Sequence, residues 1–77
     1  MTKTEILQPA LAQRIDEVMG YQINIDNYRL ALVHMEALAD PDLTEFAAQI
    51  KTLLDSEILE QKKASVMLAI IKQQLEV

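Results

Sequence analysis

The chain has 77 residues, one His, no Cys and a formal net charge of −5 at pH 7. Without Cys it can form no disulfide, and one His without thiolates cannot supply the usual ligands of structural zinc. The acidic balance disfavours non-specific binding to phosphate backbones and anionic lipid surfaces. So short a chain buries only about 60 to 65% of its unfolded surface, so association is the remaining source of added stability.

No segment is apolar enough to span a bilayer, because the longest uninterrupted apolar run is only Val66 to Ile71. The N-terminal segment also lacks the apolar stretch and the small-residue cleavage site of a secretory signal. We therefore expect a cytoplasmic protein without a membrane helix.

Good helix formers dominate the sequence, which contains one Gly and two Pro. The clearest helix stop is at Pro41, which disfavours a helical conformation at Asp40, while Asp40 and Pro41 together suit the start of a new helix. The sequence thus predicts an all-α fold with a single domain over 1–77. A helix over about 8–39 and a helix over about 41–76, with a turn at 40–41, would form an antiparallel hairpin about 45 Å long.

The segment GYQINIDNY at 20–28 fits both the alternation of a strand and the spacing of a helix. A strand here would have no second strand in the chain to pair with, so its backbone groups would lack partners. The helical interpretation instead continues a seam, the line of residues that faces the other helix. In the first helix this seam is predicted to comprise Leu11, Ile15, Val18, Tyr21, Ile25, Tyr28, Leu32, Met35 and Ala39.

The seam of the second helix has apolar ends and a polar middle. A turn centred on Asp40 and Pro41 places Gln61 opposite Gly20 and Glu57 opposite Asn24, where a hydrogen bond between Asn24 and Glu57 would set the register. The competing interpretation breaks both helices, at Gly20 and at Ser56, and gives a monomeric bundle of four short helices. In the predicted hairpin, the seam of the second helix comprises Leu43, Ala47, Ile50, Leu54, Glu57, Gln61, Ala64, Leu68, Ile71 and Leu75.

Each helix carries a second line of apolar residues that a two-helix hairpin cannot cover. Fully burying six of these side chains would contribute on the order of 9 to 18 kcal/mol before the cost of association. We therefore predict that two hairpins pair as a homodimeric four-helix bundle, and that an unidentified protein partner would use the same residues. These predicted interface residues are Ile23, Leu30, Val33, Leu59, Val66 and Ile70.

No catalytic, cofactor-binding or metal-binding residues are predicted. His34 falls outside the seam, and the sequence lacks the Glu-x-x-His motif of carboxylate-bridged metal bundles. The acidic residues are spread over several helix faces, and a narrow bundle offers no water-shielded cleft for acid–base chemistry.

The predicted function is therefore that of a small non-enzymatic protein that binds itself and another protein, as an adaptor, assembly factor or regulator. The alternative is a nucleic-acid-binding regulator of helix-turn-helix or bundle type, suggested by Gly20 between two helical stretches. Against this alternative, acidic residues surround Gly20, and Arg14 and Arg29 are the nearby cations.

Overall fold

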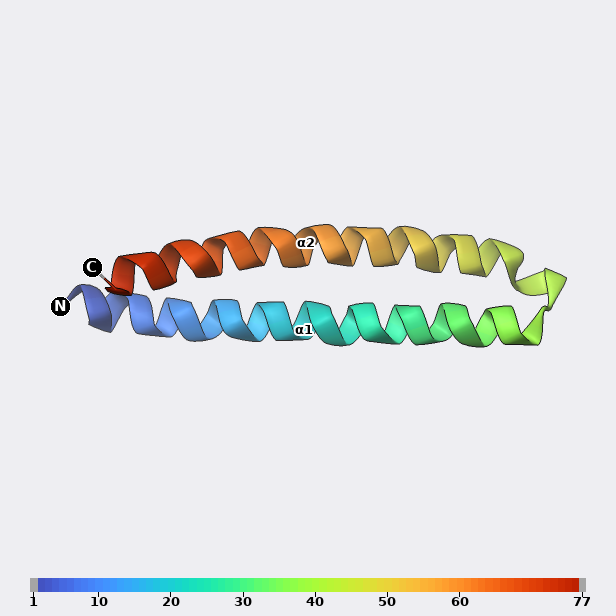
Figure 1. Ribbon diagram of the computed structural model, residues 1–77, viewed down its shortest axis with the longest axis horizontal. Coiled ribbons are helices and arrows are strands. Elements are labelled where there is room, and N and C mark those ends of the chain that lie inside the picture. Colours follow the sequence, from blue (N-terminus) through green and yellow to red (C-terminus); the bar gives the residue numbers. More distant parts are fainter. Residues whose placement is uncertain (1, 77) are drawn as a thin grey trace.

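The computed structural model describes residues 2–76 as a rod formed by two antiparallel helices (Figure 1). Helix α1 (Lys3–Leu38) and helix α2 (Thr44–Glu76) are joined through the 3-10 helix η1 (Pro41–Leu43), and residues 2–76 contain no strand. The rod measures 58 × 16 × 14 Å. Its radius of gyration is 17.4 Å, whereas a compact domain of this length would have about 11 Å. The predicted all-helical hairpin is confirmed.

Helix α1 begins at Lys3 rather than near residue 8, because a capping box forms at Thr2. The Thr2 hydroxyl accepts a hydrogen bond from the Glu5 N–H (3.2 Å), and the Thr2 N–H donates to Glu5 Oε2 (3.4 Å). These bonds satisfy backbone donors that a helix start leaves without partners. Pro9 lies inside the helix on an exposed face. Proline has no N–H to donate to the carbonyl group four residues earlier, and on this face water can bind that carbonyl instead.

Both helices are continuous, as the predicted hairpin requires, so the competing interpretation with breaks at Gly20 and Ser56 is wrong. Residues 20–28 are helical throughout, and α2 passes Ser56 without interruption. On either side of these points the two helices remain packed together, with Ile25 and Ala64 buried. This packing outweighs the cost of about 1 kcal/mol of a Gly inside a helix.

The turn forms as the sequence predicts, with one addition. Asp40 caps η1 by accepting a hydrogen bond from the Asp42 N–H (2.9 Å), and Pro41 occupies the first helical position. Ala39 has a left-handed conformation (φ 50°) and ends α1 by donating to the carbonyl groups of Met35 (3.1 Å) and Glu36 (3.2 Å). Ala39 is thus an exposed helix cap and not the last seam residue.

The core is the seam between α1 and α2. Its buried residues are Ile25, Ile50, Ala64 and Ile71, and most other predicted seam residues are half-buried. Ile15 is an exception, because it is exposed while Arg14 is half-buried and forms an ion pair with Glu17 (2.9 Å). The α1 seam therefore keeps strict alternating steps of four and three back from Ile25, through Tyr21, Val18, Arg14, Leu11 and Leu7.

Candidate interaction surface

A polar cluster at the middle of the rod connects the two helices. Asn24 Nδ2 donates to Glu57 Oε2 (3.1 Å), which confirms the predicted pair and register. Gln61 Nε2 donates to the Val18 carbonyl oxygen (3.2 Å) and to Gln22 Oε1 (2.9 Å). Since these bonds need particular levels of α1 and α2 to lie side by side, they disfavour sliding of one helix along the other.

Gly20 does not pack against Gln61, contrary to the packing expected from their opposed positions. A Cβ atom added at Gly20 would meet no heavy atom within 4 Å, so this residue faces outward beside open space. Gln61 instead reaches the neighbouring turns of α1. The hairpin itself therefore gives no steric reason for a glycine at this position.

All six predicted interface residues remain in contact with solvent. Their exposure runs from 43% for Ile70 to 67% for Leu30. A monomeric bundle with these side chains folded inside the same chain is thus ruled out by the continuous helices and by this exposure. The exposed members are Ile23, Leu30 and Val33 on α1 and Leu59, Val66 and Ile70 on α2.

The exposed apolar residues of α1 form a stripe on the side opposite the seam. Ile23 and Leu30 each lie two residues from a seam position, which is a rotation of about 200° around the helix axis. Met19, which the sequence reasoning did not include, and Val33 continue the same line. Asp26 is the charged residue between Ile23 and Leu30 in this line. We call Met19, Ile23, Asp26, Leu30 and Val33 the α1 stripe.

Helix α2 carries a matching stripe on its own outer side. Leu59 and Val66 each lie two residues beyond a seam position, and Ile70 continues the line one turn later. Lys63 is the charged residue between Leu59 and Val66, and it forms an exposed ion pair with Glu60 (3.0 Å). We call Leu59, Lys63, Val66 and Ile70 the α2 stripe.

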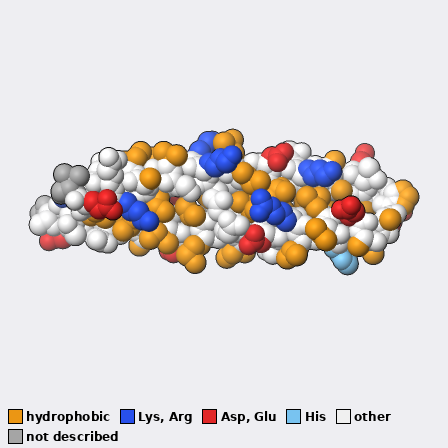
Figure 2. All heavy atoms as spheres, in the orientation of Figure 1, with side chains coloured by type: hydrophobic (Ala, Val, Ile, Leu, Met, Phe, Trp, Pro, Cys, Tyr) orange, Lys and Arg blue, Asp and Glu red, His pale blue; other side chains and the backbone are white. Residues whose placement is uncertain are grey.

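The α1 stripe and the α2 stripe lie on opposite long edges of the rod. Each faces away from the helix that its own seam contacts, and hydrophobic side chains gather along both the upper and the lower edge in Figure 2. A single flat partner therefore cannot cover both stripes at once. Covering both requires two separate contacts.

A further apolar patch near the turn escaped the sequence reasoning. Leu38, Phe46 and Leu53 are all exposed. Phe46 and Leu53 are seven residues apart, and each precedes a seam residue by one position, which is the spacing of residues that flank a helix–helix seam. That spacing is the signal from which this patch could have been predicted.

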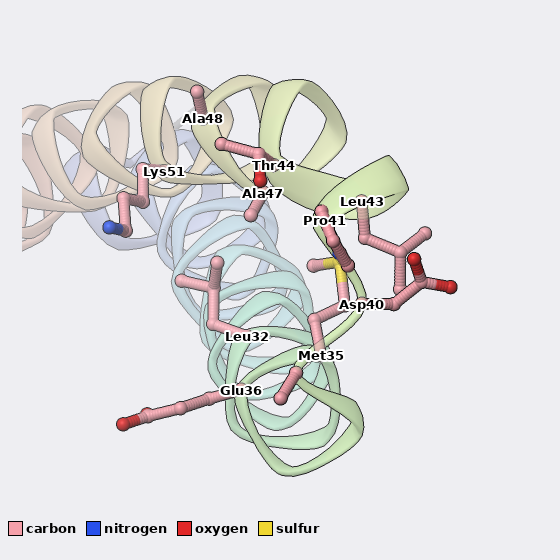
Figure 3. A pocket seen from close by; sticks show the side chains of 11 residues that line it. Leu32, Met35, Glu36, Asp40, Pro41, Leu43, Thr44, Ala47, Ala48 and Lys51 are labelled. Atoms are coloured by element: carbon pink, nitrogen blue, oxygen red, sulfur yellow. The ribbon is translucent and has the colours of Figure 1, made fainter.

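An open cleft of about 690 Å³ lies where the two helices approach the turn (Figure 3). Leu32 and Met35 extend from α1 toward the start of α2, whereas Glu36 points away from it. The cleft is lined mainly by apolar and small side chains, with Glu36, Asp40 and Lys51 as its charged groups. These lining residues include no nucleophile paired with a base, so the cleft offers shape but no catalytic constellation.

The remaining candidates for chemistry are dispersed. His34 is exposed on α1. Within residues 2–76, no group of three or more His, Asp or Glu side chains is arranged to hold a metal ion. Neither helix in this part of the chain has an apolar window long enough to cross a membrane. Comparisons with protein-family models, curated proteins and solved structures found no significant match to the chain.

Proposed function

We propose that this chain is a non-enzymatic protein–protein interaction protein, an adaptor, assembly factor or regulator, that acts as a homo-oligomer. In this proposal, two hairpins form a four-helix assembly, and further copies or another protein use the surfaces left free. The observation that carries the proposal is the exposure of the six predicted interface residues on two otherwise well-packed helices.

The total surface of the hairpin supports association. Its accessible area is 5774 Å², whereas a compact monomer of its mass, 8.7 kDa, would expose about 4700 Å². The excess is on the order of 1000 Å², which resembles the roughly 800 Å² that each partner buries in a standard protein–protein interface. Pairing would thus bring the surface per copy close to that of an ordinary globular protein.

The free energy available from burying the exposed side chains is comparable to the cost of association. Because these six residues retain about half to two thirds of their exposure, burying them would contribute roughly 1 to 2 kcal/mol each. One contact buries a single stripe from each copy, six of these side chains in all, and would contribute about 6 to 12 kcal/mol, against a cost of about 4 to 15 kcal/mol for lost freedom on association. The gain is thus of the size that association requires, and a second contact of the same copy adds to it.

Light scattering across a hundredfold dilution tests the proposal. We expect a molar mass of at least twice 8.7 kDa at low micromolar concentration. Leu30→Glu should lower that mass while most helix content remains, because Leu30 lies on the outer side of α1. Gln13→Glu, which adds the same charge at an exposed position of α1 outside the α1 stripe, is the control.

A wild-type chain that stays monomeric over the whole dilution series would overturn the proposal. Binding of DNA or RNA that weakens steeply with added salt, without self-association, would support the nucleic-acid-binding alternative instead.

A further inference from the structure

We infer that the α1 stripe of one copy packs antiparallel against the α2 stripe of a second copy, with Asp26 beside Lys63. This inference rests on the self-association proposed above and adds which surfaces meet, in which direction and at which register.

The two stripes have the same spacing when they run antiparallel. From Met19 to Leu30 the α1 stripe advances by four, three and four residues, and from Ile70 back to Leu59 the α2 stripe recedes by the same three steps. Equal steps allow successive residues to meet at common levels, as in antiparallel coiled coils. The resulting levels are Met19 with Ile70, Ile23 with Val66, Asp26 with Lys63, and Leu30 with Leu59.

Charge favours this pairing over the pairing of two identical stripes, α1 with α1 or α2 with α2, from two copies. In antiparallel pairing of α1 with α1, the same spacing would set Asp26 against Ile23, Leu30 or Asp16, and none of these is a cation. In pairing of α2 with α2, Lys63 would meet Leu59, Val66 or Gln73. A charge covered by apolar side chains loses its hydration without compensation, whereas Asp26 and Lys63 compensate each other.

Both charged groups are available for this contact. Asp26 accepts a hydrogen bond from Gln22 at Oδ1 (2.9 Å), which leaves its second oxygen for another donor. The ion pair of Lys63 with Glu60 is solvent-exposed, and exposed pairs contribute about 0 to 1 kcal/mol. Exchanging this pair for one across an interface therefore loses little.

Parallel packing of the two stripes fits less well. It could bring Asp16 beside Lys63, but the same spacing then sets Leu59 against Ala12 and leaves Val33 beyond the end of α2. The antiparallel arrangement instead gives each large apolar residue of the α2 stripe a large apolar partner.

Assembly by this contact does not close at two copies. Because the stripes lie on opposite edges, a copy that uses its α1 stripe on one neighbour keeps its α2 stripe free for another. Such a heterologous contact produces rings or open chains of subunits. Neighbouring hairpins would point in the same direction and be staggered by about one heptad, roughly 10 Å.

Exchanging the two charges tests which surfaces meet. Asp26→Lys and Lys63→Asp should each lower the weight-average molar mass several-fold at a concentration where the wild type is assembled. Mixing the two variants should restore the mass, because both stripes of one variant are then complementary in charge to the stripes of the other. Glu36→Lys and Lys72→Asp make the same charge changes outside both stripes and should leave the mass unchanged. Circular dichroism checks that all variants remain helical.

The outcomes separate this inference from the proposed function. If the wild type assembles but Lys63→Asp has no effect, or if the mixture remains as dissociated as its components, then the pairing of α1 with α2 is wrong while self-association holds. A monomeric wild type overturns both.

Cross-linking tests the register independently, since the chain contains no Cys. Ile23 and Val66 lie on opposite edges of one hairpin, so a disulfide in the Ile23→Cys, Val66→Cys double variant joins different copies. We expect oxidation to give a ladder of covalent trimers and larger species on a denaturing gel. The pair Ile23→Cys with Ile70→Cys, which matches the parallel arrangement, should give little ladder. A stronger ladder from this second pair would overturn the antiparallel register.

Discussion

The inner seam and the outer stripes contain the same kinds of residue but differ completely in their surroundings. Ile25 is 2% exposed and Ile23 is 60% exposed, although they are two residues apart on the same helix. A step of two residues turns a side chain from one side of the helix to the other. With one neighbouring helix, α1 can shield only one side, so the number of helices in the chain, and not hydrophobicity, decides which apolar residues are buried.

The largest difference in stability should separate two variants in which one of these isoleucines, Ile25 or Ile23, is truncated to alanine. We expect Ile25→Ala to lower the free energy of unfolding by about 2 to 4 kcal/mol, because it leaves a cavity in the seam. Ile23→Ala should change the stability of the dilute hairpin by no more than about 0.5 kcal/mol. Urea titration at a monomeric concentration measures both. Similar losses would mean that Ile23 is covered within the single hairpin.

A smaller effect is expected in the polar middle of the seam. Gln61→Ala removes the hydrogen bonds to the Val18 carbonyl and to Gln22, and should lower the free energy of unfolding by about 1 to 2 kcal/mol. Gln49→Ala, at an exposed position of α2, serves as the control for loss of a glutamine side chain. An unchanged urea midpoint for Gln61→Ala would show that the cluster does not stabilise the hairpin.

The smallest effect is a gain at the outer side of α1. Gly20→Ala should raise the free energy of unfolding by about 1 kcal/mol, because alanine is the better helix former and its Cβ would meet no atom within 4 Å. The converse change Ala12→Gly, also at an exposed position, should lower it by a similar amount. Thermal denaturation of the two variants gives the comparison. A destabilised Gly20→Ala hairpin would contradict the open space at this position.

The features that could be predicted from the sequence are those set by local spacing. The turn at Asp40 and Pro41 determines which levels of the helices meet, and this was enough to predict the hydrogen bond between Asn24 and Glu57. The outward position of Leu30 likewise follows from its two-residue offset from Leu32. These features depend on helix geometry and one turn, so the sequence contains the information needed.

The errors arose where composition was weighed above geometry. Ile15 was placed in the seam because it is apolar, but the strict spacing requires Arg14, whose charge Glu17 neutralises. Gly20 was expected to accommodate Gln61, yet it faces outward beside open space, and the helix is continuous there, contrary to the competing interpretation. The start of α1 was placed too late because the capping box at Thr2 and Glu5 was overlooked.

The first turn of α1 and the last turn of α2 lie at the same end of the rod, with the acidic turn at the other end (Figure 1). If neighbouring hairpins join in the same direction, every turn lies along one border of the assembly, and Asp40 and Asp42 recur there at each subunit. The opposite border collects the first turn of α1 and the last turn of α2 from each copy. Such a ribbon or ring would be two-sided, with a repeating row of turn carboxylates along one rim only at the spacing of the subunits.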